Sequence, residues 1–146
     1  MAAVFALLAI TGARRGEVLA LRWTDYDPKL KVPRISKSVG YAPDHGIYVK
    51  STKTHNIRRL AVDETMEIVI FSQMEALKKN VFPGFDLAGD PYLFPGNPGG
   101  FGPVHPDTPP KVFRKVCDSL SLPYHLHQLR HFVATELIAL RGKPRP

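Results

Sequence analysis

The order of apolar and polar residues along the chain predicts several helices. Residues 1–10 are apolar almost throughout and predict a buried helix, which Thr11-Gly12 ends. Four later stretches carry apolar residues at helical spacing: Glu17 to Trp23, a stretch from a predicted N-cap at Asp63 to Lys79, Lys111 to Leu120, and a last one from His127 onward. Two of these helices are expected to face the core with an apolar stripe, made of Met66, Val69, Ile70, Met74 and Leu77 in one and Val112, Phe113, Val116 and Leu120 in the other.

The segment from Lys31 to Val62 has the composition of β-strands. Isoleucine, leucine and valine recur there around two turn-forming stretches, Gly40 to Gly46 and Thr54-His55-Asn56. This pattern predicts an antiparallel sheet of about three strands. Residues 81–110 hold most of the prolines and glycines and predict a long loop, either functional or mobile. The expected fold class is α+β, mainly helical with a small three-stranded antiparallel sheet.

Composition narrows the class of partner. The 146 residues are 44% hydrophobic and 23% charged, which suits one globular domain with a core. The formal net charge of +7 indicates a polyanionic partner, most often nucleic acid. The single cysteine, Cys117, excludes an internal disulfide, fits a reducing compartment and is expected in the core. Residues 1–10 are too short to span a bilayer and lack the basic region of a signal peptide, so no membrane partner is expected.

The sequence His127-Gln128-Leu129-Arg130-His131 opens the last predicted helix. Residues at i, i+3 and i+4 share one face of a helix, so His127, Arg130 and His131 are expected to point the same way. Arginine gives bidentate hydrogen bonds to an oxyanion, and histidine exchanges a proton near neutral pH. The pentapeptide is therefore a candidate oxyanion site, although the solvated polar end of a core helix has the same pattern.

Two earlier segments carry further candidate phosphate ligands. Arg14 follows the Thr11-Gly12 break, and Glu17 can hold its side chain in place, although an ordinary surface ion pair has the same spacing. Lys53 falls at the expected tip of a β-hairpin, on the face set by alternate residues of the preceding strand. There it can swing into a site and donate a proton, although a solvated charge is the commoner role of a lone lysine.

In this order, the three segments resemble the catalytic domain of the tyrosine recombinases, the phage integrase family. The stretch from Thr11 to Asp25 is similar to the first box of that family, Lys53 to Arg59 to its β-hairpin lysine segment, and His127 to His131 to its second box. The resemblance covers nearly the whole chain and implies the mainly helical recombinase catalytic core. It also implies that DNA and other recombinase subunits are partners, that the protein is cytoplasmic and bacterial or phage-derived, and that neither a metal nor a nucleotide or other small-molecule cofactor is needed.

The resemblance implies a role for each matching residue. Arg14 and Arg130 would clamp the scissile phosphate and stabilise its pentacoordinate transition state. Lys53 would contact the DNA phosphate as a general acid toward the leaving 5′-oxygen, and His127 would assist proton transfer at the attacking side. Supporting roles fall to two further motif positions, Glu17 and His131.

The sequence departs from the family in one large respect. The family's nucleophile is a tyrosine well after the second box, preceded by a Gly-His or Gly-Trp box, and this sequence ends at Pro146 with neither. All five tyrosines precede the second box: Tyr26, Tyr41, Tyr48, Tyr92 and Tyr124. We expect no counterpart of the family's N-terminal core-binding domain in these residues either. Residues 1–146 are therefore expected to be a partial catalytic domain, from a truncated gene or a cut polypeptide. Such a fragment would bind DNA phosphate but lack catalysis, because it has no nucleophile.

Two other functions fit parts of the sequence. His127 and His131 have the i, i+4 spacing of zinc ligands on a helix, with His125 nearby, as a metal-dependent hydrolase would require. Gln128, however, stands where a metalloprotease would have its glutamate base, and no acidic third ligand is evident. The other function is a non-catalytic basic module that holds DNA through contacts carrying affinity but little sequence information.

Overall fold

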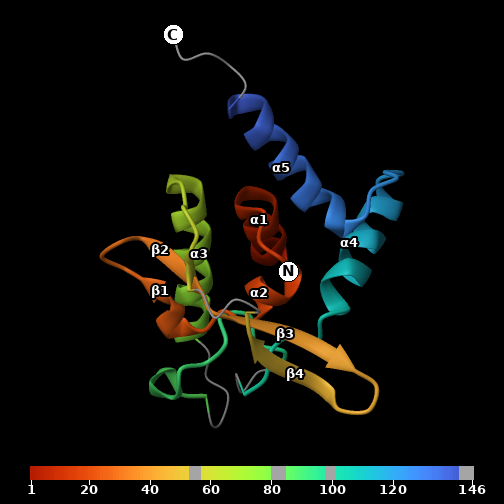
Figure 1. Ribbon diagram of the computed structural model, residues 1–146. Coiled ribbons are helices and arrows are strands. Elements are labelled where there is room, and N and C mark those ends of the chain that lie inside the picture. Colours follow the sequence, from red (N-terminus) through yellow and green to blue (C-terminus); the bar gives the residue numbers. More distant parts are fainter. Residues whose placement is uncertain (53–56, 80–84, 98–100, 142–146) are drawn as a thin grey trace.

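The computed structural model describes residues 1–52, 57–79, 85–97 and 101–141 (Figure 1). The helices in this part of the chain are α1 (Ala2–Thr11), α2 (Arg15–Leu19), α3 (Glu64–Lys78), α4 (Thr108–Ser119) and α5 (Leu126–Arg141), with two 3₁₀ turns, η1 (Trp23–Asp25) and η2 (Leu87–Gly89). The strands are β1 (Tyr26–Asp27), β2 (Val32–Ile35), β3 (Lys37–Ala42), β4 (Gly46–Ser51) and β5 (Arg58–Arg59). The α+β, mainly helical class predicted from the sequence is confirmed.

Helix α1 lies at the centre of the molecule, as its apolar sequence predicts. It packs against α3 on one side and against α5 on the other, and α2 follows at its C-terminal end (Figure 1). Val4, Leu7 and Leu8 are buried in the core. The helix ends at Gly12, which adopts the left-handed conformation (φ 62°) and donates its N–H to the carbonyl of Leu8. This turn directs the chain out of the core toward α2.

The strands form two small antiparallel sheets, whereas the sequence predicted a single sheet. One sheet has the strand order β1-β2-β5, and the other is the β3-β4 hairpin. The residues before the first predicted turn form two strands, because β2, which contains Ile35, pairs with β1 and β5, while β3, which contains Val39, pairs with β4. The turn predicted for residues 54–56 lies outside the described residues.

The hairpin turn is also shorter than the predicted stretch from Gly40 to Gly46. Strand β3 continues to Ala42, and Gly40 lies opposite Tyr48 in the ladder. The tyrosine ring occupies the space that a β-carbon at Gly40 would need. An aromatic cross-strand neighbour thereby keeps a weak strand former inside the strand.

The predicted helix from Glu17 to Trp23 is wrong in its extent. Helix α2 already ends at Leu19, and η1 starts at Trp23. Between them the backbone pairs with a distant segment: Leu93 N–H donates to the carbonyl of Leu21 at 2.8 Å, and Trp23 N–H donates to Pro91 at 2.9 Å. Residues 91–94 are all buried, so part of the predicted loop 81–110 belongs to the core.

The third predicted helix is confirmed and the fourth is confirmed in part. Asp63 caps α3 by accepting a hydrogen bond from the backbone N–H of Met66 at 2.8 Å. The predicted stripe of α3 faces the core, with Met66, Ile70 and Leu77 buried and Val69 and Met74 partly buried.

Helix α4 turns a different face inward from the one predicted. Its Val116 is 47% exposed and its Leu120 is 62% exposed, so both were wrongly assigned to the core. The helix buries Pro109 and Cys117 instead, the cysteine as predicted, and sets Phe113 edge-on against Phe5 of α1. No helix in the described part of the chain is long and apolar enough to cross a bilayer.

Candidate phosphate-binding site

Arg14 stands at the point where the chain leaves α1 and enters α2. Ala13 before it is buried, whereas the Arg14 side chain is 64% exposed. Arg14 is the N-cap of α2 and has extended backbone angles (φ −73°, ψ 146°). The short connection from Gly12 therefore fixes the Arg14 backbone against the core while its guanidinium projects outward.

Glu17 anchors this turn from inside the protein. Its side chain is only 4% exposed, and Glu17 is the one buried charged residue in the described part of the chain. Its Oε2 accepts hydrogen bonds from Arg14 N–H at 2.8 Å and from Arg58 Nη2 at 2.7 Å. Its Oε1 lies 3.5 Å from Arg14 Nη1. A buried carboxylate requires such partners, because an unpaired one carries a large desolvation cost.

Gly16 sets α2 tightly against β3. A β-carbon at Gly16 would overlap the carbonyl oxygen of Val39 and the hydroxyl of Ser38. Only glycine permits this approach, which places the Arg14–Glu17 turn directly over the hairpin. The position of the arginine thus depends on a backbone contact between α2 and β3.

The second half of the site comes from the first turns of α5. Leu126 is buried and secures the start of the helix, while His127 and Arg130 are exposed. His125 N–H donates to Gln128 Oε1 at 2.6 Å, a side-chain cap of the helix N-terminus. The His127 ring lies 5.9 Å from the ring of His131 and 6.0 Å from that of His125, measured between ring centres.

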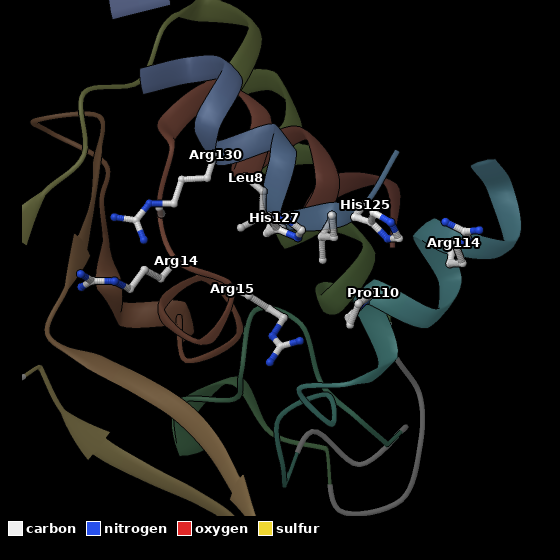
Figure 2. Close-up of a pocket in the computed structure, with 10 residues that line it drawn as sticks. Leu8, Arg14, Arg15, Pro110, Arg114, His125, His127 and Arg130 are labelled. Carbon is white, nitrogen blue, oxygen red and sulfur yellow. The ribbon is translucent and has the colours of Figure 1, made fainter. Parts of the chain in front are cut away.

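Arg14, His127 and Arg130 line one cavity of about 420 Å³, although they come from opposite ends of the sequence (Figure 2). In Figure 2 the guanidinium groups of Arg14 and Arg130 point to the same side. Two more arginines line the cavity, Arg15 and Arg114, and none of its described lining residues is acidic. A cavity lined in this way attracts an anion.

A second cavity, of about 280 Å³, adjoins Arg14 on its other side. Arg14 and Glu17 line it together with Ser38 of β3 and the end of the β4 region, Lys50, Ser51 and Thr52. Lys53, the predicted proton donor, comes next in the sequence but lies outside the described residues. Its participation therefore stays a prediction. His131, one of the two predicted supporting residues, does not line either cavity.

Arg15, Arg58 and Arg114 were given no role at the site from the sequence, and His125 was considered there only beside possible metal ligands. Arg15, Arg114 and His125 line the main cavity, and Arg58 binds the buried Glu17. Arg15 and Arg114 also have acidic neighbours: Arg15 Nη1 is 4.0 Å from Asp107 Oδ1, and Arg114 Nε is 3.0 Å from Asp118 Oδ1. Of these contacts only the i, i+4 spacing of Arg114 and Asp118 was visible in the sequence. The contact of Arg58 with Glu17 joins residues far apart and depends on the fold.

The tyrosines lie elsewhere. All five belong to the described part of the chain, and none of them lines the cavity of Arg14 or the one beside it. Tyr124, which is nearest to the second box in sequence, lines another groove between α4 and α5 with Phe113, Leu129 and Phe132. This groove shares His125 with the lining of the main cavity. Among the described residues, no three histidine, cysteine or acidic side chains come together as metal ligands would.

Known structures share this arrangement of helices and strands. The Tn1549 transposon integrase in complex with a circular intermediate DNA has a TM-score of 0.79 and 22% identity, over 97% of this chain and 46% of that chain. The same integrase in complex with transposon right end DNA has a TM-score of 0.74 and 19% identity, over 97% of this chain and 46% of that chain. The crystal structure of XerA recombinase has a TM-score of 0.70 and 20% identity, over 97% of this chain and 43% of that chain. The chain thus spans less than half the length of each, and at these identities the likeness is one of fold.

The family model gives the assignment. No curated protein sequence matches the chain significantly. The model of the phage integrase family, in contrast, matches residues 1–142. The match extends over nearly the whole sequence and includes all three motifs described above, from the stretch at Arg14 to the stretch at Arg130. This protein therefore belongs to the phage integrase family, the tyrosine recombinases.

Proposed function

We propose that this chain is the phosphate-binding part of a site-specific DNA recombinase and that its main cavity receives a DNA phosphodiester. The observation that carries the proposal is the meeting of Arg14 and Arg130 at one opening. Two arginines that face one space supply several charge-assisted hydrogen bonds to phosphate oxygens, and their planar groups match the geometry of a phosphate. Such donors also stabilise the extra negative charge of a pentacoordinate transition state.

In this proposal the neighbouring residues serve proton transfer. His127 lies one helical turn before Arg130 on the same cavity wall, where an imidazole can exchange a proton with an attacking oxygen. Lys53 comes next in the sequence after Thr52, which lines the adjoining cavity, and we assign to Lys53 the general-acid role toward the leaving 5′-oxygen. Glu17 supports Arg14 through its buried carboxylate, and His131 supports His127 through the edge contact of their rings.

DNA is the proposed partner of this cavity. The net charge of +7 favours a polyanion. Two of the similar Tn1549 integrase structures are complexes with DNA, as described above. Other recombinase subunits are proposed as further partners, since an attacking tyrosine has to come from outside the cavity described here. The simpler alternative is a module that binds DNA through the same arginines but does not break or rejoin DNA strands.

The test is DNA binding by charge-matched variants. Arg14→Ala and Arg130→Ala are each expected to weaken binding of a short fluorescein-labelled duplex about tenfold or more, because each loses hydrogen bonds to a charged group. Lys78→Ala removes the same charge from α3, where Lys78 pairs with Glu75 at 2.7 Å and lines neither cavity. Fluorescence anisotropy over a series of salt concentrations gives both affinity and its salt dependence.

The Lys78→Ala control distinguishes binding at a specific phosphate site from general electrostatic attraction between the protein and DNA. Lys78→Ala should change affinity about twofold or less, and its salt slope should remain that of the unmodified chain. Each arginine variant should also reduce the salt slope by about one, the value for one lost phosphate contact. Equal, small losses for all three variants would refute a phosphate site at this cavity.

A further inference from the structure

Arg58 is the closest cationic partner of the buried Glu17, although the two residues lie on different elements. Its Nη2 is 2.7 Å from Glu17 Oε2, whereas Arg14 Nη1 is 3.5 Å from Glu17 Oε1. Arg58 reaches this position from β5, where its backbone pairs with Ile35 of β2. Two arginines therefore share one carboxylate, and the shorter contact belongs to the one outside the cavity lined by Arg14 and Arg130.

Because Arg58 shares the Glu17 carboxylate, the positive charge of Arg14 is only partly neutralised and can act on a ligand. A buried carboxylate interacts strongly with nearby cations, because the local dielectric constant is low. If Arg14 were its only partner, their charges would cancel and the guanidinium would be drawn toward the protein. With Arg58 the group of three has a charge of +1. The Arg14 side chain then stays 64% exposed at the mouth of the cavity.

We propose that Arg58 is a positioning residue for the phosphate site: it neutralises Glu17 and so leaves the Arg14 guanidinium to an incoming DNA phosphodiester. This inference rests on the proposed function, since it assigns the phosphate to Arg14. Arg58 also joins β5, which follows residues 53–56 closely in the sequence, to the α2 turn that carries Arg14. The contact thus ties β5 to the turn that carries Arg14.

The neighbouring arginine provides a matched control. Arg59 belongs to the same two-residue strand and has the same charge, but it pairs with Arg34 across the ladder and lines a different cavity, formed by residues around β1 and β2. Arg58→Ala and Arg59→Ala therefore remove equal charges from adjacent positions. Only the first leaves Glu17 with Arg14 as its remaining cationic partner among the described ion pairs.

The experiment measures binding of the labelled duplex by the whole chain and its variants, at a temperature where a melting curve shows each one folded. Arg58→Ala is expected to weaken binding about tenfold and Arg59→Ala about twofold or less. The double variant Glu17→Gln/Arg58→Ala should recover most of the loss, because a neutral amide no longer competes with the phosphate for Arg14. A role in folding alone would change the melting temperature without this recovery of affinity.

Each outcome decides the inference separately from the proposed function. If Arg14→Ala leaves binding unchanged, the phosphate site itself is refuted. If Arg14→Ala weakens binding but Arg58→Ala behaves like Arg59→Ala, the positioning role is refuted and the phosphate site stands. If the double variant binds as weakly as Arg58→Ala, Arg58 does not act through Glu17, which also overturns the inference. Arg58→Lys, which keeps the charge, should bind DNA better than Arg58→Ala, and equal affinities would count against neutralisation.

Discussion

At the scale of single residues, the site combines exposed cations with one buried anion. Arg14 and Arg130 can offer their guanidinium groups to a ligand because their backbones are fixed by buried neighbours, Ala13 and Leu126. Glu17 is buried and fully engaged by its arginine and backbone partners. The resemblance to the recombinase boxes pointed to Arg14, His127 and Arg130, which line one cavity in the structure, and to Glu17, which contacts Arg14. The roles of these residues stay predictions. The resemblance could not find Arg58, because its partner lies on a different element and no local spacing connects the two.

The tyrosines lead to a prediction about chemistry at this scale. None of the five lines the cavity where the proposed phosphate would bind, and attack on a phosphodiester requires a nucleophile close to it. The 146-residue polypeptide alone is therefore expected to form no covalent adduct with a nicked suicide DNA substrate. A denaturing gel detects such an adduct as a DNA-linked protein band.

The control for this experiment is a Tyr124→Phe variant, since Tyr124 is the tyrosine nearest to the second box in the sequence. The variant and the unmodified chain should both give a lane without a DNA-linked protein band. A band that forms without a partner protein and disappears in a Tyr124→Phe or other tyrosine variant would show that one of these tyrosines attacks the DNA, contrary to the prediction.

At the scale of elements, the sequence predicted helices better than it predicted how they pair with other segments. The apolar run of α1, the capped α3 and the start of α5 are local features, and all were found. Helix α2 was predicted from Glu17 to Trp23 but runs from Arg15 to Leu19, because the backbone of Leu21 and Trp23 bonds to residues 91–93, far along the chain. Helix α4 was predicted with the wrong inner face, since Val116 and Leu120 fit a helical stripe that the neighbouring helices do not cover. In α2 a tertiary contact replaced the locally predicted helix, and in α4 the predicted apolar stripe has no neighbouring element to cover it.

The packing of α2 on β3 gives a prediction for stability and binding together. Gly16→Ala would force the new methyl group against the Val39 carbonyl, a backbone atom that cannot easily give way. We expect the free energy of unfolding to fall by about 1–3 kcal/mol, as overpacking does elsewhere, and DNA affinity to fall with it. Denaturant unfolding measures the first and fluorescence anisotropy the second.

Gly89→Ala serves as the comparison, because nothing lies within 4 Å of a β-carbon at that position. It should leave both measurements nearly unchanged. If Gly16→Ala were as harmless as Gly89→Ala, the close contact of α2 with β3 would not determine the position of Arg14.

At the scale of the whole molecule, the fold brings the two ends of the sequence to one cavity. Helix α1 lies between α3 and α5, and Arg14 follows it at the start of α2, so the packing of α1 against α5 brings the two arginines to one cavity (Figure 1). The fold is that of the phage integrase family, and the chain spans less than half the length of the similar integrase structures. We propose that the residues described here hold a DNA phosphate between Arg14 and Arg130.

A crystal structure of the chain bound to a short DNA duplex tests the central claim most directly. We predict a backbone phosphate within hydrogen-bonding distance of the guanidinium groups of both Arg14 and Arg130, with His127 beside it, because these three residues line one cavity without acidic neighbours in its described lining. DNA bound on another face, for example at the cavity of Arg34 and Arg59, with Arg14 and Arg130 both facing solvent, would contradict the account.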